Sequence, residues 1–201
     1  MIYLDNAATT KYKPDEVYDA FNYYVREIGV SPGRGSYQLG IEASRMLYQT
    51  RKLVGRYFGI TEPNVVFTKN STEAINLFFR GVLKQGDHVV ITCYEHNAVL
   101  RPLHKMKEEG IIDYSVINRN DLLLSPEEIF KKYVRKNTTL FEMTLASNLT
   151  GRIVFNRELL QFMKAKGIKT FVDSSQGAGK ITINMAEDAV DYLSLIHISE
   201  P

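Results

Sequence analysis

The 201-residue sequence has a single cysteine, Cys93, and no tryptophan. One cysteine excludes an internal disulfide and any zinc site built from several cysteines. Long apolar runs are also missing, because polar or charged residues interrupt each of them well before the roughly 18 residues that a membrane span needs. The opening Met-Ile-Tyr-Leu-Asp lacks the basic and apolar regions of a signal peptide. We therefore expect a cytoplasmic protein that does not enter a membrane.

An excess of one charge sign is absent as well, since 25 Lys and Arg face 23 Asp and Glu, for a net charge of +2. The basic residues are scattered, whereas a nucleic-acid surface needs them clustered on one face, so no nucleic-acid partner is expected. With 44% hydrophobic residues, 12 tyrosines and 10 phenylalanines, the chain can bury a core. Its length corresponds to roughly one to one and a half domains.

Hydrophobic periodicity predicts helices and strands that alternate along most of the chain. Helices are expected at 15–29, in an amphipathic stretch ended by Gly59, and at 71–81, 99–109, from 126 onward and 157–166. The amphipathic stretch should bury one stripe, made of Met46, Leu47, Thr50, Leu53, Val54 and Tyr57. Short apolar strands are expected at 65–68, 89–93, 114–117, 139–146 and 170–172. This alternation predicts an α/β fold with a mostly parallel sheet covered by helices.

Polar residues follow several of these strands, and ligands of such sheets bind beyond the carboxyl ends of the strands. Taken singly, each has an ordinary explanation, such as a helix cap, a structural histidine or an Asn-Gly turn. Taken together, they place an anion cradle, an imidazole, two amides and a carboxylate at one edge, which is typical of a small-molecule site. The candidate residues are Ser71, Thr72, His96, Asn148, Asp173 and Gln176. We predict no metal site.

Pyridoxal phosphate suits this set, because it combines a phosphate, a flat ring, a ring nitrogen that should stay protonated and a phenolic oxygen. Ser71 and Thr72, at a helix start, could take the phosphate. His96 could lie flat against the ring. Asp173 could keep the ring nitrogen protonated, so that the ring accepts electrons. The amides of Asn148 and Gln176 could donate to the phenolic oxygen.

Five motifs resemble the class V aminotransferase fold, and within it the cysteine desulfurases. They are Tyr-Leu-Asp-Asn-Ala-Ala-Thr-Thr at 3–10, Phe-Thr-Lys-Asn-Ser-Thr-Glu-Ala-Ile-Asn at 67–76, Glu-His at 95–96, Asn-Leu-Thr-Gly at 148–151 and Val-Asp-Ser-Ser-Gln at 172–176. Their order and spacing are specific, and the resemblance covers residues 2 to about 192. One departure is Asn70, which stands where many relatives have glycine.

The resemblance implies the large domain of a fold type I pyridoxal-phosphate enzyme that converts cysteine to alanine and transfers the sulfur to an enzyme cysteine. It implies the same cofactor contacts, with His96 also assisting proton transfer. It further implies L-cysteine as substrate, a sulfur-acceptor protein as a possible partner and a homodimer at full length. Two other functions stay open: another class V activity, such as a selenocysteine lyase, a kynureninase-like cleavage or an aminotransferase, and a non-catalytic module that binds pyridoxal phosphate or phosphate.

Two residues that the resemblance requires are missing, the Schiff-base lysine and the nucleophilic cysteine. Lys180 comes too soon after Asp173, and Lys69 precedes the phosphate cradle, so neither suits the first role. Cys93 ends an apolar strand and is expected to be buried and inert.

The last nine residues, 193–201, resemble a translated sequencing adapter. We therefore expect a truncated chain with a non-native tail, in which His197 has no role. The alternative interpretation is a genuine short protein. The expected divisions are an N-terminal segment at 1–30, an incomplete cofactor-binding domain at 31–192 and the tail at 193–201. The chain as given is expected to be inactive.

Overall fold

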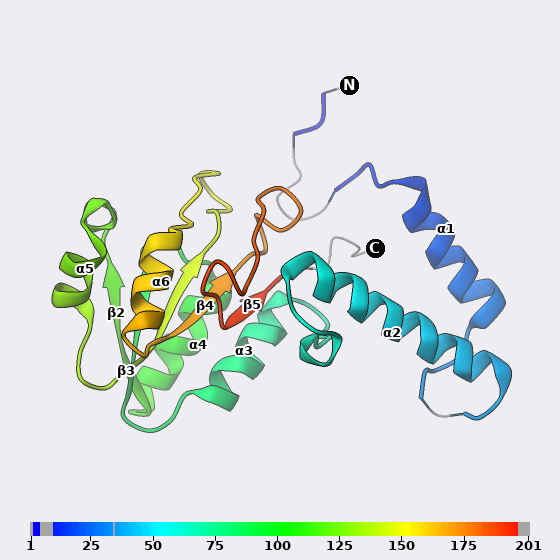
Figure 1. Cartoon of the computed structure of the whole chain (residues 1–201), viewed down its shortest axis with the longest axis horizontal. Coiled ribbons are helices and arrows are strands. Elements are labelled where there is room, and N and C mark those ends of the chain that lie inside the picture. Colours follow the sequence, from blue (N-terminus) through cyan, green and yellow to red (C-terminus); the bar gives the residue numbers. More distant parts are fainter. Residues whose placement is uncertain (1, 5–9, 34, 197–201) are drawn as a thin grey trace. The chain divides into compact units, whose positions relative to one another are not determined.

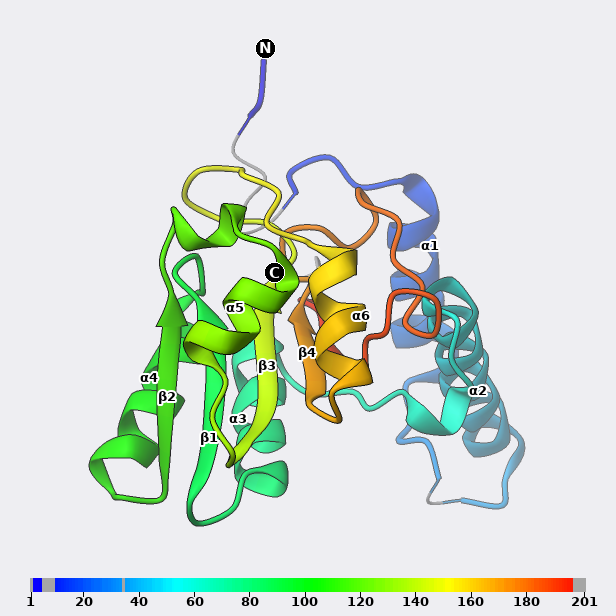
Figure 2. The same cartoon turned by 60° about the vertical axis from the view of Figure 1, so that its left-hand side comes forward.

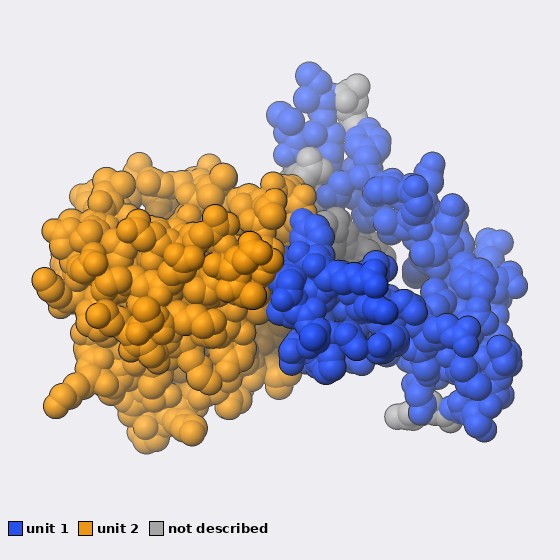
Figure 3. Space-filling view, viewed as in Figure 1, with its two compact units in different colours: residues 1–66, 198–201 blue, residues 67–197 orange. Residues whose placement is uncertain are grey.

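The computed structural model describes residues 2–4, 10–33 and 35–196. Residues 5–9 of the first motif, Arg34 of the following loop and His197 with the rest of the tail lie outside the described residues. The chain divides into two compact units, residues 1–66 with 198–201 and residues 67–197 (Figure 3). The expected divisions after residues 30 and 192 stay a prediction.

The first unit is helical. Its elements are α1 (Asp15–Tyr23), the π-helical turn η1 (Tyr24–Ile28), α2 (Gln38–Phe58) and the 3₁₀ turn η2 (Glu62–Asn64). Gly29 and Gly59 follow η1 and α2 with positive φ angles of 57° and 73°, which glycine adopts without strain. The helices predicted at 15–29 and before Gly59 are therefore confirmed.

The buried stripe predicted along α2 is wrong. Leu53 is 63% exposed and Tyr57 is 55% exposed, whereas the helix buries Gly40, Ala43, Gly55 and Phe58. The glycines explain the difference, because the chain approaches α2 where side chains are smallest. A Cβ atom on Gly55, for instance, would lie 2.7 Å from the carbonyl oxygen of Ile60. Periodicity locates an apolar face but does not show which face the neighbouring chain covers.

The second unit contains a five-stranded sheet in the order β2-β1-β3-β4-β5, and every pairing is parallel (Figure 1). The strands are β1 (Asp87–Thr92), β2 (Ile112–Ile117), β3 (Thr138–Thr144), β4 (Lys169–Asp173) and β5 (Tyr192–Ser194). The predicted α/β fold with a parallel sheet is confirmed. Four of the predicted strands are present, with ends shifted by at most two residues.

Helices cover both faces of this sheet (Figure 2). One face carries α3 (Ser71–Val82) and α4 (Asn97–Glu108), and the other carries α5 (Pro126–Tyr133) and α6 (Arg157–Ala165); the 3₁₀ turn η3 (Asp121–Leu123) precedes α5. Ser125 caps α5 in a reciprocal arrangement with Glu128, as Ser-Pro-Glu-Glu predicts. Coverage of both faces explains why the central strands are almost continuously apolar. The core against α3 and α4 includes Ile75, Phe79, Val89, Ile91, Val99, Leu103, Leu140 and Phe171.

The strand predicted at 65–68 is wrong. The backbone there forms no strand, Val66 is 70% exposed, and the N–H of Val65 closes the η2 turn by donating to the carbonyl of Glu62 at 3.1 Å. A strand needs a neighbouring strand to complete its backbone hydrogen bonds, and no described strand lies beside this segment. A short apolar run is compatible with a buried strand and with an extended connection, so the pattern alone does not distinguish them.

The strand β5 was not predicted; it pairs with β4 through Val172 opposite Leu193 and Asp173 opposite Ser194. Three residues are too few to show an alternating pattern. Leu193 and Ser194 are the first two residues of the segment expected to be a non-native tail, an expectation that stays a prediction.

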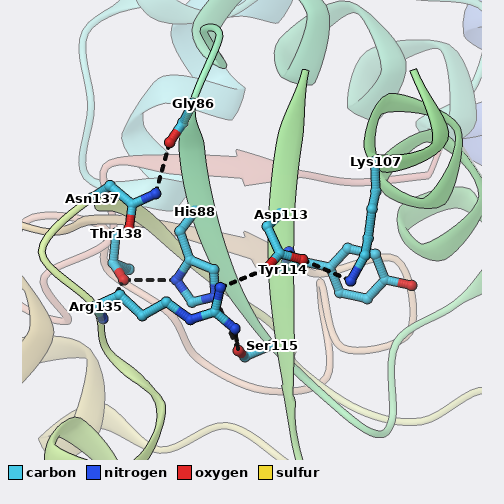
Figure 4. A network of polar contacts seen from close by, with 9 residues as sticks. All are labelled: Gly86, His88, Lys107, Asp113, Tyr114, Ser115, Arg135, Asn137 and Thr138. Carbon is cyan, nitrogen blue, oxygen red and sulfur yellow. Dashed lines mark hydrogen bonds and ion pairs between the residues drawn. The ribbon is translucent and has the colours of Figure 1, made fainter. Parts of the chain in front are cut away.

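At the amino end of β1, a polar network surrounds the buried side chain of His88 (Figure 4). Its Nδ1 lies 2.7 Å from Thr138 Oγ1, and its Nε2 lies 2.9 Å from Ser115 Oγ. Arg135 also donates to Ser115 Oγ, at 3.3 Å, and pairs with Asp113. Burial, followed by the nearby positive charge of Arg135, lowers the pKa of His88 to about 4.

This network makes the free energy of unfolding depend on pH. Between pH 6.5 and about 4 the unfolded chain binds a proton at His88 that the folded chain does not, so the free energy of unfolding should fall as pH falls through that window. In His88→Gln this component should be absent, so the slope of its unfolding free energy against pH should be less positive than that of the unaltered chain in this window. His104→Gln, at an exposed position on α4, is the control. Equal slopes for the chain and His88→Gln, measured by denaturant unfolding, would contradict this account.

Candidate cofactor-binding site

The carboxyl edge of the sheet has the topology of a binding crevice. From β1 the chain moves outward to β2 and then returns to β3 on the other side of β1. Connections therefore leave β1 and β3 in opposite directions, and ligands of open α/β sheets bind at such a switch point. Three of the predicted residues, His96, Asn148 and Asp173, follow or end the strands β1, β3 and β4 at this edge.

The start of α3 offers backbone donors to an anion. Asn70 is the N-cap, and its side chain accepts from the N–H of Glu73 at 2.8 Å. Glu73 in turn accepts from the N–H of Lys69 at 2.6 Å. The first-turn N–H groups that remain are those of Ser71 and Thr72, at the positive end of the helix dipole. Asn70 has an extended backbone with φ −163°, which any residue adopts, so its replacement of glycine does not strain this turn.

Asp173 ends β4, where it is 3% exposed. Its Oδ1 atom accepts three hydrogen bonds, from Ser175 N at 3.1 Å, Ser175 Oγ at 2.6 Å and Ser194 Oγ at 3.0 Å. These bonds fix the orientation of the carboxyl group. Because all three reach Oδ1, the other oxygen, Oδ2, is the one that can receive a further donor.

Ser175 connects the anion cradle to this carboxylate. Its hydroxyl lies 3.0 Å from Ser71 Oγ and 2.6 Å from Asp173 Oδ1. Ser71 and Ser175 are 104 residues apart in sequence, so the fold brings two of the predicted residues together through one intervening serine. Ser175 was not among the predicted site residues, although it lies inside the Asp-to-Gln motif at 172–176.

His96 and Asn148 occupy the same edge with exposed side chains. His96 is the N-cap of α4, and its Nδ1 accepts from the N–H of Ala98 at 3.1 Å, so its neutral ring carries the proton on Nε2. Asn148 lies in the turn after β3, which is closed by the N–H of Gly151 donating to the carbonyl of Ser147. Among the described hydrogen bonds, none joins His96 or Asn148 to Asp173.

Gln176 is half-buried in the turn after Asp173. Lys69 and Lys180, which the sequence analysis weighed as lysine candidates, are both exposed.

Cys93 is exposed, so the expectation of a buried cysteine is wrong. The reason is that β1 ends at Thr92, and Cys93 is the first residue of the loop that follows. Partial desolvation nevertheless raises the pKa of its thiol, which lowers its thiolate content.

Two further findings concern the described part of the chain alone. It holds no cluster of three or more His, Cys, Asp or Glu side chains arranged to bind a metal ion. None of its helices combines the length and apolar character needed to cross a membrane.

The chain closely resembles known proteins along nearly its whole length. The family described as Aminotransferase class-V matches residues 2–195. A cysteine desulfurase IscS from Dictyoglomus turgidum is 31% identical over 96% of this chain and 50% of that protein. A probable cysteine desulfurase from Methanothermobacter thermautotrophicus is 29% identical over 95% of this chain and 48% of its own length. The solved structure of an apo cysteine desulfurase from Thermococcus onnurineus superposes with a TM-score of 0.86, at 30% identity, over 96% of this chain and 49% of that one. The chain thus spans about half the length of these relatives.

The turn after Asp173 depends on a close approach at Gly177. A Cβ atom there would lie 2.0 Å from Leu145 Cδ2, and Leu145 is fully buried, so its shift would disturb the packing around it. Gly177→Ala should therefore lower the free energy of unfolding by about 1–3 kcal/mol. Gly81→Ala is the matched control, because an added Cβ meets nothing within 4 Å there and alanine favours the helix. Denaturant midpoints measure both changes, and equal midpoints would show that the turn does not need this glycine.

Proposed function

Because the chain belongs to the aminotransferase class-V family, we propose that it carries the cofactor site of a pyridoxal-phosphate-dependent cysteine desulfurase. Such an enzyme converts L-cysteine to alanine and transfers the sulfur to an enzyme cysteine. Two named relatives, each about twice as long as this chain, support the choice of reaction. The observation that carries the proposal is the Ser71–Ser175–Asp173 connection, which unites a phosphate cradle with a buried carboxylate.

The donor set fits pyridoxal phosphate at both ends of that molecule. The N–H groups and hydroxyls of Ser71 and Thr72 would bind the phosphate. Asp173 Oδ2 would accept from the ring nitrogen, since Oδ1 is already occupied by three donors. When bound, the cofactor supplies an electron sink, and a carboxylate beside the ring nitrogen keeps that nitrogen protonated.

His96 would lie against the ring with its Nε2–H directed away from the helix cap. In this arrangement the Nε2–H group of His96 can donate a hydrogen bond. Transfer of that proton would require Nδ1 to take up another, which would break its hydrogen bond with the N–H of Ala98. An imidazole, which can donate at one ring nitrogen and accept at the other, suits proton transfer at the substrate. Asn148 and Gln176 would donate to the phenolic oxygen.

Neither the Schiff-base lysine nor the nucleophilic cysteine is assigned within this chain. After Asp173 the sequence has one lysine, Lys180, which is exposed and belongs to the turn that follows the site. Cys93 is a poor nucleophile because its pKa is raised. The proposal includes L-cysteine as the substrate of the whole enzyme, a sulfur-acceptor protein, a homodimer and a cytoplasmic location.

Equilibrium binding of pyridoxal phosphate to this chain tests the site. We expect saturable binding that Thr72→Ala weakens by about tenfold, because one hydrogen bond to a charged group contributes roughly 1.5–3 kcal/mol. Asp173→Asn should weaken binding comparably, because the ring nitrogen loses its charged partner. Asp19→Asn, at an exposed position on α1, is the control and should bind like the unaltered chain. Identical affinities in all four proteins would refute the assigned site.

Reduction with borohydride tests the assignment of the missing lysine. After loading with pyridoxal phosphate, this chain should show no stable adduct at a specific lysine by mass spectrometry, and the absorbance band of the cofactor should remain that of the free aldehyde. An adduct confined to Lys180 would overturn the assignment, because Lys180 would then perform the role that the proposal places elsewhere.

A further inference from the structure

Two buried glutamates, Glu95 and Glu142, interact with each other beneath the switch point, and neither has a role in the proposed chemistry. Glu142 is fully buried on β3, and Glu95 is 8% exposed in the loop between β1 and α4. Isolated carboxylates are costly to bury, so their presence requires compensating partners. The partners of the two groups differ sharply.

Glu142 lies in apolar surroundings. Its neighbours on the adjacent strands are Ile91 on β1 and Phe171 on β4. Strand alternation places it on the same face as Leu140, which packs in the core against α3 and α4. No described group donates a hydrogen bond to either of its carboxyl oxygens.

Glu95, in contrast, completes the sheet where β1 and β3 separate. The ladder between these strands ends at the pair Ile91 and Glu142. Beyond it, the N–H of Thr144 donates to Glu95 Oε1 at 3.0 Å, and the Thr92 hydroxyl donates a short hydrogen bond to the same oxygen. The Glu95 carboxylate therefore accepts the hydrogen bond of the Thr144 N–H, which a backbone carbonyl of β1 would accept if the ladder continued. Its second oxygen, Oε2, has no donor among the described residues.

One proton resolves this arrangement. As two carboxylates, the pair would leave Glu95 Oε2 and both oxygens of Glu142 buried without donors, which native structures avoid. We propose that Glu142 is a carboxylic acid that donates its proton to Glu95 Oε2, and that this shared-proton pair fixes the loop carrying His96 at the open end of β1 and β3. Glu95 directly precedes His96, so the pair acts as a positioning device rather than as a catalytic group.

The surrounding charges favour placing the proton on Glu142. Two donors at Oε1 stabilise the charged form of Glu95, whereas Glu142 has none. Burial first, and then the negative charge of Glu95, raise the pKa of Glu142 well above its ordinary value. Burial also raises the pKa of Glu95, and Asp173 on β4 is a further negative group that acts on both. The two carboxyls titrate as a unit.

Infrared spectroscopy detects the shared proton without using the cofactor. The folded chain near neutral pH should show the carbonyl stretch of a protonated carboxylic acid, and Glu142→Gln should lack it. Glu127→Gln, at an exposed position on α5, should retain it. Absence of the band from the unaltered chain, or its persistence in Glu142→Gln, would overturn the proposal.

The pH dependence of unfolding gives a second test. A raised pKa means that the folded chain binds the extra proton, so the contribution of this carboxyl to the free energy of unfolding is fully present below about pH 4.5 and is lost as pH rises. The amide of Glu142→Gln can donate the same hydrogen bond but does not titrate. Above about pH 4.5, the ratio of folded to unfolded protein should therefore fall with rising pH by up to tenfold per pH unit more in the unaltered chain than in Glu142→Gln. Parallel profiles for the two proteins, or a Glu142→Gln chain that does not fold, would contradict a donor role. Neither test depends on pyridoxal phosphate binding, so failure here leaves the proposed function standing.

Discussion

The candidate site depends on the contacts of the Ser175 hydroxyl with Ser71 and Asp173. They join the first turn of α3 to the last residue of β4, so a helix dipole and a buried carboxylate face the same edge. The parallel sheet makes this possible, because β1, β3 and β4 all end at that edge. Ser194 of β5 donates to Asp173 Oδ1, so the short strand takes part in orienting the same carboxylate.

The switch point imposes a second constraint, since neighbouring strands must separate there to open a crevice. Separation frees backbone donors that would otherwise be paired within the ladder. At β1 and β3 the freed N–H of Thr144 is accepted by Glu95, and at β4 the carbonyl of Asp173 accepts from Leu145 N at 2.8 Å. Glu95, immediately before His96, and Asp173, the last residue of β4, are thus held by polar contacts that complete the sheet edge.

Much of the fold could be predicted from local sequence patterns, but only where the pattern itself determines the structure. Features that depend on contacts with distant parts of the chain could not be predicted in this way. The buried strands β1, β3 and β4 and the capped helix α5 were predictable, because apolar continuity and a Ser-Pro start are local properties. The segment at 65–68 and the stripe on α2 failed, because local apolarity does not reveal whether a partner covers it. The candidate residues could be chosen from strand ends, whereas Ser175 could not, since its role depends on Ser71 more than a hundred residues away.

A crystal structure of this chain with pyridoxal phosphate bound addresses the central claim most directly. The account predicts the phosphate within hydrogen-bond distance of the Ser71 and Thr72 N–H groups, and the ring nitrogen within such a distance of Asp173 Oδ2. A cofactor that contacts the start of α3 but points its ring nitrogen away from Asp173, or that binds at another edge of the sheet, would contradict the account.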